Sequence, residues 1–302
     1  MAAQYCRNLI TPTFYRDARY PLGAANGRSP TEPRRNIEKL AIAVTFHYDE
    51  SRFAYLSQTT SQFGLLANKV DVAVVTNVSD EERQDNIRRA ISHDSFSLQV
   101  ISPAFLEHPY LLTWSHFDLF RRLFREDQSI THFMYLEDDI RVNPENIAYW
   151  LRGRESLRQF GLIPSFLRYE LKKHDNRPYS TDVTRNVKLV RLPRVRVTDT
   201  YFYVNLPQPY QGMYLLDREL MNEHIVKPSS SPEFGSWGIR EKAAQGLTFA
   251  NVPKGCLSRN FVGYDMEQAH IDSKCLIHHT PNNYADNPNT RHGKILVSEL
   301  IS

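Results

Sequence analysis

The chain has 302 residues, enough to bury a core without disulfides or structural metals. Its 41 % hydrophobic and 24 % charged residues are typical of a globular protein. The net charge of +3 is too small to indicate the dense basic face of a nucleic-acid-binding protein, so no nucleic-acid partner is expected.

The cysteines and the hydropathy pattern exclude two further classes of protein. Cys6, Cys256 and Cys275 lie far apart and form no CxxC pair, which argues against a zinc ribbon and a disulfide framework and favours a reducing compartment. No apolar run approaches the ~20 residues that span a bilayer. We therefore expect a cytoplasmic protein. Any contact that it makes with a membrane is expected to be peripheral.

The first half of the chain alternates apolar runs with amphipathic segments, after an irregular arm over residues 1–37. The apolar runs predict buried strands and the amphipathic segments predict helices. In chain order we expect strands at 40–46, 70–76, 96–101 and 131–136, with helices at 51–66, 79–90 and 111–124. This alternation is typical of a parallel sheet with helices on its faces, an α/β fold.

The second half has a less regular pattern. Pro144 suits the first position of a helix, which we expect over 144–160. A polar loop then precedes a strand with alternating basic residues. The remaining predicted elements are a loop at 172–185, strands at 187–197, 201–206 and 212–216, helices at 217–225 and 237–245, and an apolar strand that ends at the late histidine pair.

Three acidic residues, Glu137, Asp138 and Asp139, directly follow the fourth predicted strand. Like charges repel at such a half-dry position, and a divalent cation compensates them because it prefers carboxylate ligands. Ligands of open α/β sheets bind beyond the carboxyl ends of the strands, where this triplet lies. In extended backbone Glu137 and Asp139 point to one face and Asp138 to the other, so we expect two of the three to reach one site. The alternative is a solvated turn that caps the following helix.

The triplet resembles the DxD-type motif of GT-A glycosyltransferases, and is similar to the Glu-Asp-Asp form in N-acetylglucosaminyltransferase I. The resemblance extends to the order of elements over residues 40–280. It implies a GT-A fold, a Rossmann-like mixed sheet flanked by helices, as a single domain over 38–302. Residues 38–140 would be its nucleotide-binding half, and 141–302 its acceptor-binding half with a C-terminal tail.

The same resemblance implies roles for the triplet. Asp139 would bind Mn²⁺ or Mg²⁺ directly, and the ion would bridge the two phosphates of the donor. Glu137 is a further candidate for the ion, and either Asp138 or Glu137 would hold ribose, sugar or an ion-bound water. A C-terminal histidine often completes such a metal site, and both His278 and His279 are candidates. Strand alternation allows only one of the two to face the site, and we favour His279.

Two other late segments fit the resemblance. The run that begins at Gly212 resembles the strand that floors the donor-sugar pocket, where glycine allows close approach of the backbone. Trp237-Gly238 followed by Glu241 resembles the segment that carries the general base of inverting enzymes. Here Lys242 takes the place of the family's second acid, so Glu233 is a second candidate for the base. Trp237 is expected to stack on an acceptor sugar, the alternative being a core ring, and the alternative for Glu241 is an acid favoured by the helix dipole.

The part of the site that binds the nucleotide is expected beside the first two predicted strands. Thr45, His47 and Tyr48 lie at the end of the first strand and Asn77 follows the second, at the edge where GT-A enzymes bind base and ribose. Tyr48 would stack on a uracil, and Asn77 would hydrogen-bond to it. The sequence contains no Walker-type loop, and no GxGxxG follows a strand.

We therefore predict a metal-dependent glycosyltransferase that moves a sugar from a nucleoside diphosphate sugar, UDP-linked by preference, to a glycan or glycolipid. The predicted mechanism is inverting, with Glu241 as base. Three alternatives are a retaining enzyme in which Glu241 positions substrate, a non-catalytic GT-A-like glycan-binding module, and a phosphohydrolase or nucleotidyltransferase. The last class usually needs more carboxylates than the triplet provides, and intact metal-site residues argue against the non-catalytic module.

Overall fold

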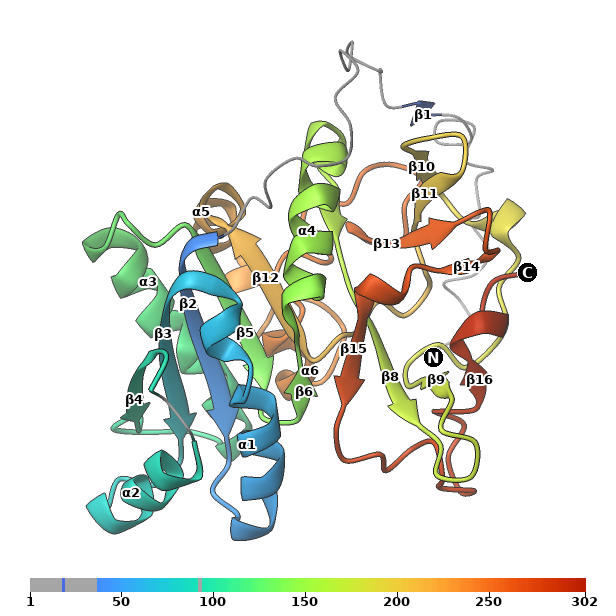
Figure 1. Ribbon diagram of the computed structural model, residues 1–302. Helices are drawn as coiled ribbons and strands as arrows, with labels where there is room; N and C mark the ends of the chain where they lie inside the picture. The colour runs from blue at the N-terminus through green and yellow to red at the C-terminus, as the bar shows by residue number, and fades with distance from the viewer. Residues whose placement is uncertain (1–17, 20–36, 92–93) are drawn as a thin grey trace.

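Five strands form the central sheet, in the order β12-β5-β2-β3-β4 (Figure 1). The computed structural model describes residues 18–19, 37–91 and 94–302, so nearly all of the predicted arm over 1–37 lies outside the described residues. Four strands run parallel and β12 is antiparallel to β5. Their bounds are β2 (Ile37–Phe46), β3 (Ala67–Thr76), β4 (Ser97–Ile101), β5 (His132–Glu137) and β12 (Met213–Asp217).

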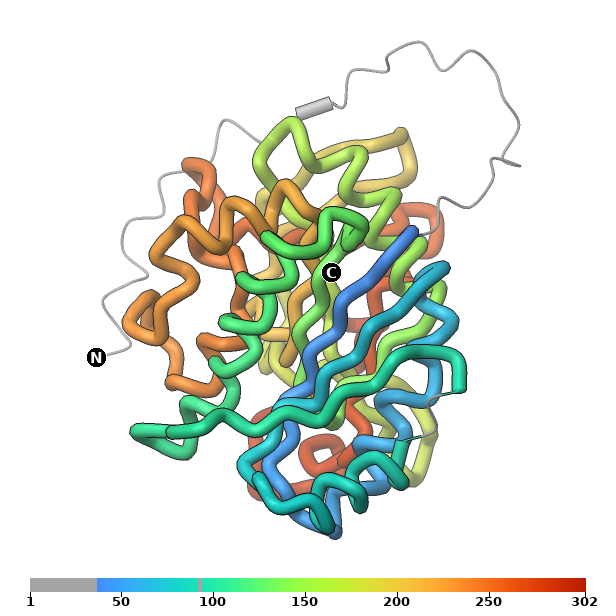
Figure 2. The backbone as a smooth tube through the Cα atoms, turned by 90° about the vertical axis from the view of Figure 1, so that its left-hand side faces the viewer, coloured from blue at the N-terminus to red at the C-terminus, as the bar shows by residue number. Residues whose placement is uncertain are grey.

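Helices cover both faces of this sheet. α1 (Phe53–Thr60) connects β2 to β3, and α2 (Glu81–Ala90) connects β3 to β4. α3 (His116–Glu126) returns the chain to β5, on the far side of β2. Because parallel crossovers are right-handed, this reversal places α3 on the face opposite α1, as Figure 2 shows. The mixed α/β architecture is therefore the one expected from the alternating sequence pattern.

The predicted helices are shorter in the structure than their apolar patterns indicate. Short 3-10 helices replace one or both ends of α1 and α3, and Asp80, not Ser79, caps α2 by accepting a hydrogen bond from the Arg83 nitrogen at 3.0 Å. The short helices of the first half are η1 (Glu50–Arg52), η2 (Phe63–Leu65) and η3 (Pro109–Trp114).

Two smaller sheets make up much of the second half. One has the order β1-β10-β11-β13-β14, with β7 beside β13, and the other has the order β16-β9-β8-β15-β6. The strands of the first are β1 (Ala18–Arg19), β7 (Ile163–Pro164), β10 (Arg194–Arg196), β11 (Tyr201–Val204), β13 (Asn260–Asp265) and β14 (His270–Ile271). Those of the second are β6 (Ile140–Arg141), β8 (Leu167–Leu171), β9 (Pro178–Ser180), β15 (Leu276–His279) and β16 (Ile295–Leu296).

Several elements of this half differ from the prediction. The strand expected over 187–197 is wrong: it is a 3-10 turn followed by the three residues of β10, separated by Pro193, whose nitrogen cannot donate to a ladder. β8 (LRYEL) alternates apolar and charged residues but is not predicted, and neither is β13, which carries no clear period-2 signal. β9 lies inside the predicted loop. The remaining helices are α4 (Pro144–Leu157), α5 (Arg218–Val226), α6 (Ile239–Ala243), η4 (Arg158–Phe160), η5 (Leu189–Arg191), η6 (Pro228–Ser230), η7 (Ser273–Cys275) and η8 (Val297–Glu299).

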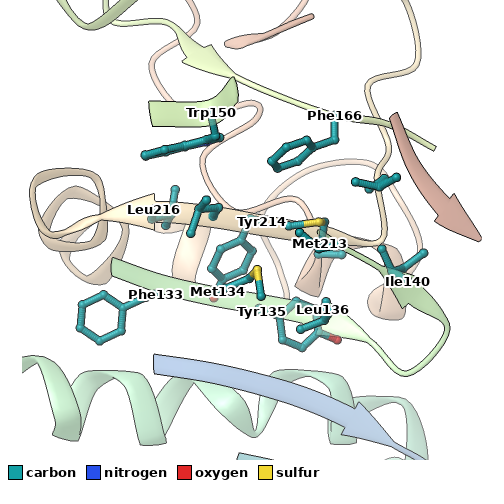
Figure 3. Packing of buried hydrophobic residues seen from close by; sticks show 14 of the residues in the cluster. Phe133, Met134, Tyr135, Leu136, Ile140, Trp150, Phe166, Met213, Tyr214 and Leu216 are labelled. Carbon is teal, nitrogen blue, oxygen red and sulfur yellow. The ribbon is translucent and has the colours of Figure 1, made fainter. Parts of the chain in front are cut away.

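A continuous hydrophobic core joins the three sheets. Trp150 of α4 and Phe166 lie beside β12, close to its residues Met213, Tyr214 and Leu216 (Figure 3). The same cluster reaches the inner residues of both smaller sheets. Burial of this apolar surface holds the second half against the end of β5.

α4 begins at Pro144, as predicted, and its cap also fixes β15. The Asn143 side chain accepts hydrogen bonds from the Glu145 and Asn146 nitrogens, and Asn146 Oδ1 accepts from the Asn143 nitrogen at 2.9 Å. The buried Asn146 amide donates to the carbonyls of Lys274 and Leu276 at 2.8 and 2.9 Å. A local capping box thereby positions the strand that carries the histidine pair.

The structure shows the state of two of the three cysteines and the lengths of the described helices. Cys256 and Cys275 are free, while Cys6 lies outside the described residues. None of the helices in the described ranges combines the length and hydrophobicity that crossing a bilayer requires.

Gly212→Ala is expected to destabilise the protein more than Gly161→Ala. Both glycines have positive φ, +66° and +67°, so each substitution costs about 1 kcal/mol in backbone strain. An added Cβ at Gly161 meets nothing within 4 Å, whereas at Gly212 it would lie 2.9 Å from Glu137 Oε2 and 3.1 Å from Ile140. We expect about 1–2 kcal/mol of additional loss at Gly212 in urea unfolding. Equal losses in the two variants would contradict the close approach of β12 to the triplet.

Candidate functional site

A cavity of about 670 Å³ opens at the carboxyl edge of the central sheet. The chain order reverses at β2, whose neighbours β3 and β5 lead away in opposite directions, and such switch points are where open α/β sheets bind ligands. The ends of β2 and β5 meet here, with Thr45 paired to Glu137. The predicted site residues that line this cavity are Thr45, His47, Glu137, Asp138, Asp139, Trp237, Glu241 and His279.

The acidic triplet does not continue the strand. β5 ends at Glu137, and Asp138 and Asp139 form the turn into β6. The expectation that Asp138 faces away from Asp139 is therefore wrong, because strand alternation stops where the backbone turns. All three acidic residues line the same cavity.

Three other segments hold the backbone of this turn. The Glu137 nitrogen donates to the Gly212 carbonyl at 3.0 Å. The buried Thr59 hydroxyl of α1 donates to the Asp138 carbonyl at 3.0 Å. The Thr280 nitrogen, just after β15, donates to the Asp139 carbonyl at 2.9 Å. The carboxylates therefore stand on a rigid support built from both halves of the chain.

Arg52 lies in η1, just after the end of β2, and its charge compensates the two aspartates of the triplet. Asp49 caps η1 through the Ser51 nitrogen at 2.9 Å, and this one-turn helix directs Arg52 toward the triplet. Arg52 Nε and Nη2 donate to the two oxygens of Asp138 at 2.8 and 2.7 Å, and Nη2 also donates to Asp139 Oδ2 at 2.8 Å. Burial nevertheless raises the pKa of Asp138 to about 6 against the effect of these bonds.

His279 faces Asp139 from the end of β15, opposite Ile140 of β6. Its Nε2 lies 3.6 Å from Asp139 Oδ2, and its Nδ1 donates to the carboxylate of Glu170 at 2.6 Å. Glu170 is fully buried on β8, and its second oxygen accepts from the nitrogens of Tyr284 and Ala285 at 2.8 and 2.6 Å. A carboxylate behind one imidazole nitrogen is the arrangement that orients a metal-binding histidine.

These contacts set opposite pKa shifts at Asp139 and His279. Burial acts to raise the pKa of Asp139, but His279 and Arg52 outweigh it and lower the pKa to about 2. Burial acts to lower the pKa of His279, but the contacts with Asp139 and Glu170 outweigh it and raise the pKa. Asp139 is thus strongly favoured as a carboxylate, and the same contacts make the proton of His279 harder to remove.

Glu137 has hydrogen-bond and charge partners of its own in the cavity lining. The Tyr210 hydroxyl donates to Glu137 Oε1, and Arg168 Nη1 lies 3.9 Å from Oε2. Arg168 is itself held by Asp182, through bonds of 3.0 and 2.9 Å, and stacks on the Tyr210 ring. Burial and the charge of Asp139 raise the pKa of Glu137 to about 7.

The donor set fits a divalent ion shared with a ligand. In the described part of the chain, Asp139 Oδ1 is buried and has no hydrogen-bond partner, which leaves a carboxylate oxygen unsatisfied within the cavity lining. Within that same part, no group of three or more His, Cys, Asp or Glu side chains is arranged to hold an ion alone. An ion held by Asp139 and His279 would therefore take its other ligands from phosphates or water, as Mg²⁺ sites commonly do.

The late segment brings an acid and aromatic rings to the cavity. Glu241 lies in the first turn of α6, and Trp114 Nε1 donates to the Ile239 carbonyl at 2.9 Å, which fixes this short helix. Trp237 packs edge-on against Tyr210 and Phe249, with ring centroids 5.4 and 4.8 Å apart. An acid and a half-buried ring thus stand side by side on one wall.

The other predicted site residues do not line the cavity. Tyr48 packs beside Phe46 and Phe53, and Asn77 accepts a hydrogen bond from the Tyr48 nitrogen at 2.8 Å, so the two hold the loop after β2. The ring of His278 stacks on Tyr169, 5.1 Å away. Gly212 supports Glu137 from behind, and Glu233 is exposed in the loop before α6.

Sequence reasoning missed the residues that compensate and orient the triplet. Arg52 had a usable signal, because it follows a predicted strand at the correct edge. A lone acid within LRYEL was the signal for Glu170, but the strand itself was not predicted. The missed residues that contact the site are Arg52, Arg168, Glu170, Asp182, Tyr210 and Tyr284.

Glu170→Gln is expected to destabilise the metal-free protein by about 2–4 kcal/mol, because a buried charge partner of His279 is lost. A raised histidine pKa stabilises the fold below the unfolded value of about 6.5, and this contribution disappears as pH rises through the folded pKa. The gap between wild type and variant should therefore be larger at about pH 6 than at about pH 9 in urea unfolding.

Glu126→Gln is the matched control, since this acid is exposed on α3 and pairs only loosely with Arg122 at 4.0 Å. It should change stability by less than about 1 kcal/mol at either pH. A pH-independent gap for Glu170→Gln would show that Glu170 does not hold the His279 proton.

No protein-family model matches the chain, and no curated protein matches it. The function of the chain is therefore inferred from its fold and from the geometry of this site.

Proposed function

We propose that the protein is a metal-dependent glycosyltransferase of the GT-A type. It transfers a sugar from a nucleoside diphosphate sugar, with UDP the favoured nucleotide, to a glycan or glycolipid acceptor. The observation that carries the proposal is the contact of Asp139 with His279, backed by Glu170, at the switch point of the sheet. The cavity around it lies in the size range of small-molecule sites.

Asp139 and His279 are the residues that would hold Mn²⁺ or Mg²⁺. The unsatisfied Asp139 Oδ1 and the oriented His279 ring support this assignment. When bound, the ion supplies Lewis-acid compensation for the negative charge of the leaving diphosphate. Glu137 and Asp138 line the same cavity and would accept hydrogen bonds from ribose or sugar hydroxyls.

Glu241 is the best-placed general base. It lines the cavity while 41 % of its side chain stays exposed, so it can reach a substrate hydroxyl there. In the inverting reaction it removes the proton of the acceptor hydroxyl as that oxygen bonds to the anomeric carbon and the diphosphate leaves. Trp237, beside it, offers a ring face for the acceptor sugar.

Metal-dependent UDP binding tests the donor site. Calorimetry should detect UDP binding to the wild type in the presence of Mn²⁺ and little without it. Asp139→Asn removes a ligand charge and should weaken binding at least about tenfold. Asp199→Asn, at a side chain that is 94 % exposed, makes the same chemical change on the surface and should leave binding unaltered. Silence of the wild type toward UDP, GDP and CMP with Mn²⁺ present would overturn the proposed activity.

Paired substitutions of the two candidate acids test the base. Glu241→Gln should lower the rate of UDP release from an accepted UDP-sugar by about 10²–10⁴-fold without changing UDP affinity. Glu233→Gln, at an exposed position outside the cavity, should leave the rate unchanged. Full turnover in Glu241→Gln would instead favour a retaining reaction in which Glu241 has no proton to remove.

A further inference from the structure

The guanidinium of Arg52 occupies a position that a metal ion would need. His279 Nε2 lies 3.6 Å from Asp139 Oδ2, so a cation held by these two side chains would compete with any other cation at that carboxylate. Arg52 Nη2 already donates to the same oxygen at 2.8 Å, and the two Arg52 bonds to Asp138 hold it there. A divalent ion beside a fixed guanidinium is also repelled by its charge.

We propose that Arg52 is an exchangeable counter-cation: it holds the Asp138–Asp139 pair while the donor site is empty, and turns to the diphosphate when ion and donor bind together. This inference rests on the proposed function and adds a specific role for one residue. Its consequence is that Arg52 weakens binding of the ion alone and strengthens binding of ion and diphosphate as a unit.

The surroundings of Arg52 permit such an exchange. It lies on the short η1 segment at the cavity wall, with 32 % of its side chain exposed and its guanidinium 5.6 Å from the exposed face of the Tyr55 ring. Its bonds to Asp138 and Asp139 use Nε and Nη2 only. Two oxygens of a diphosphate offer a guanidinium group the same paired acceptors as a carboxylate, and the guanidinium binds either through paired hydrogen bonds.

Thermodynamic linkage makes the proposal measurable. If Arg52 blocks the ion and then assists the diphosphate, each ligand raises the affinity for the other by one common factor. Removing Arg52 reduces that factor in two ways, because the ion alone then binds more tightly and the pair binds more weakly. Loss of a purely structural residue would weaken both.

The test compares Mn²⁺ alone with Mn²⁺ plus inorganic pyrophosphate, on the full chain, by calorimetry and by the electron paramagnetic resonance signal of free Mn²⁺. Arg52→Gln should bind Mn²⁺ alone roughly tenfold more tightly than wild type, and pyrophosphate with Mn²⁺ present roughly tenfold more weakly. Arg52→Lys keeps the charge but not the paired hydrogen-bond geometry, so its two affinities should lie between those of wild type and Arg52→Gln.

Arg88→Gln is the matched control. Arg88 also bridges two carboxylates, Glu81 and Asp85, at 2.8 and 2.5 Å, but on the exposed surface of α2. It should leave both affinities unchanged. Thermal melting checks folding, and if Arg52→Gln is unfolded, tighter Mn²⁺ binding by Arg52→Lys supports the proposal and unchanged binding overturns it.

The outcomes separate this inference from the proposed function. If the wild type binds Mn²⁺ with pyrophosphate and Arg52→Gln behaves like Arg88→Gln, only the role of Arg52 is overturned. If no form of the protein binds Mn²⁺ even with pyrophosphate, the metal site and the proposed transferase activity are overturned as well.

Discussion

Charge compensation at the end of β5 is the constraint on which the site depends. Three carboxylates follow one buried strand, and burying them without positive partners would cost far more than the fold's net stability. Arg52, Arg168 and His279 supply those partners from η1, β8 and β15. The charges of the triplet therefore link the central sheet to one of the smaller sheets through named contacts as well as through the shared hydrophobic core.

The compensation is uneven, and this unevenness gives the site its chemistry. Arg52 donates hydrogen bonds to both carboxylate oxygens of Asp138. In the described part of the chain, one buried oxygen of Asp139 has no hydrogen-bond partner. Glu137 has a pKa raised to about 7 and Asp139 one lowered to about 2, although only one residue separates them. Neighbouring carboxylates whose pKa values are shifted in opposite directions are typical of functional sites, because each environment favours a different protonation state.

Much of the central sheet follows from local sequence, while the second half does not. Strands such as 40–46 and 70–76 are buried on both faces, so their continuous apolar runs identify them directly. β8 carries Arg168 and Glu170 at buried positions, so its charged residues and not only its apolar ones face inward, and an apolar pattern does not identify the strand. Pro193 interrupts the predicted strand over 187–197 and leaves only β10 after it as strand, because the proline nitrogen cannot donate to a ladder.

The sequence by itself determined the α/β class, the edge of the sheet where the cavity opens, and three of the residues that line it, Asp139, Trp237 and Glu241. Those properties depend on strand order and on where strands end, which local patterns record. Only the tertiary structure decided that His279 and not His278 faces Asp139, that the triplet turns after Glu137, and that Arg52 holds both aspartates. Such choices depend on hydrogen bonds between segments that are distant in sequence, and no local pattern encodes their partners.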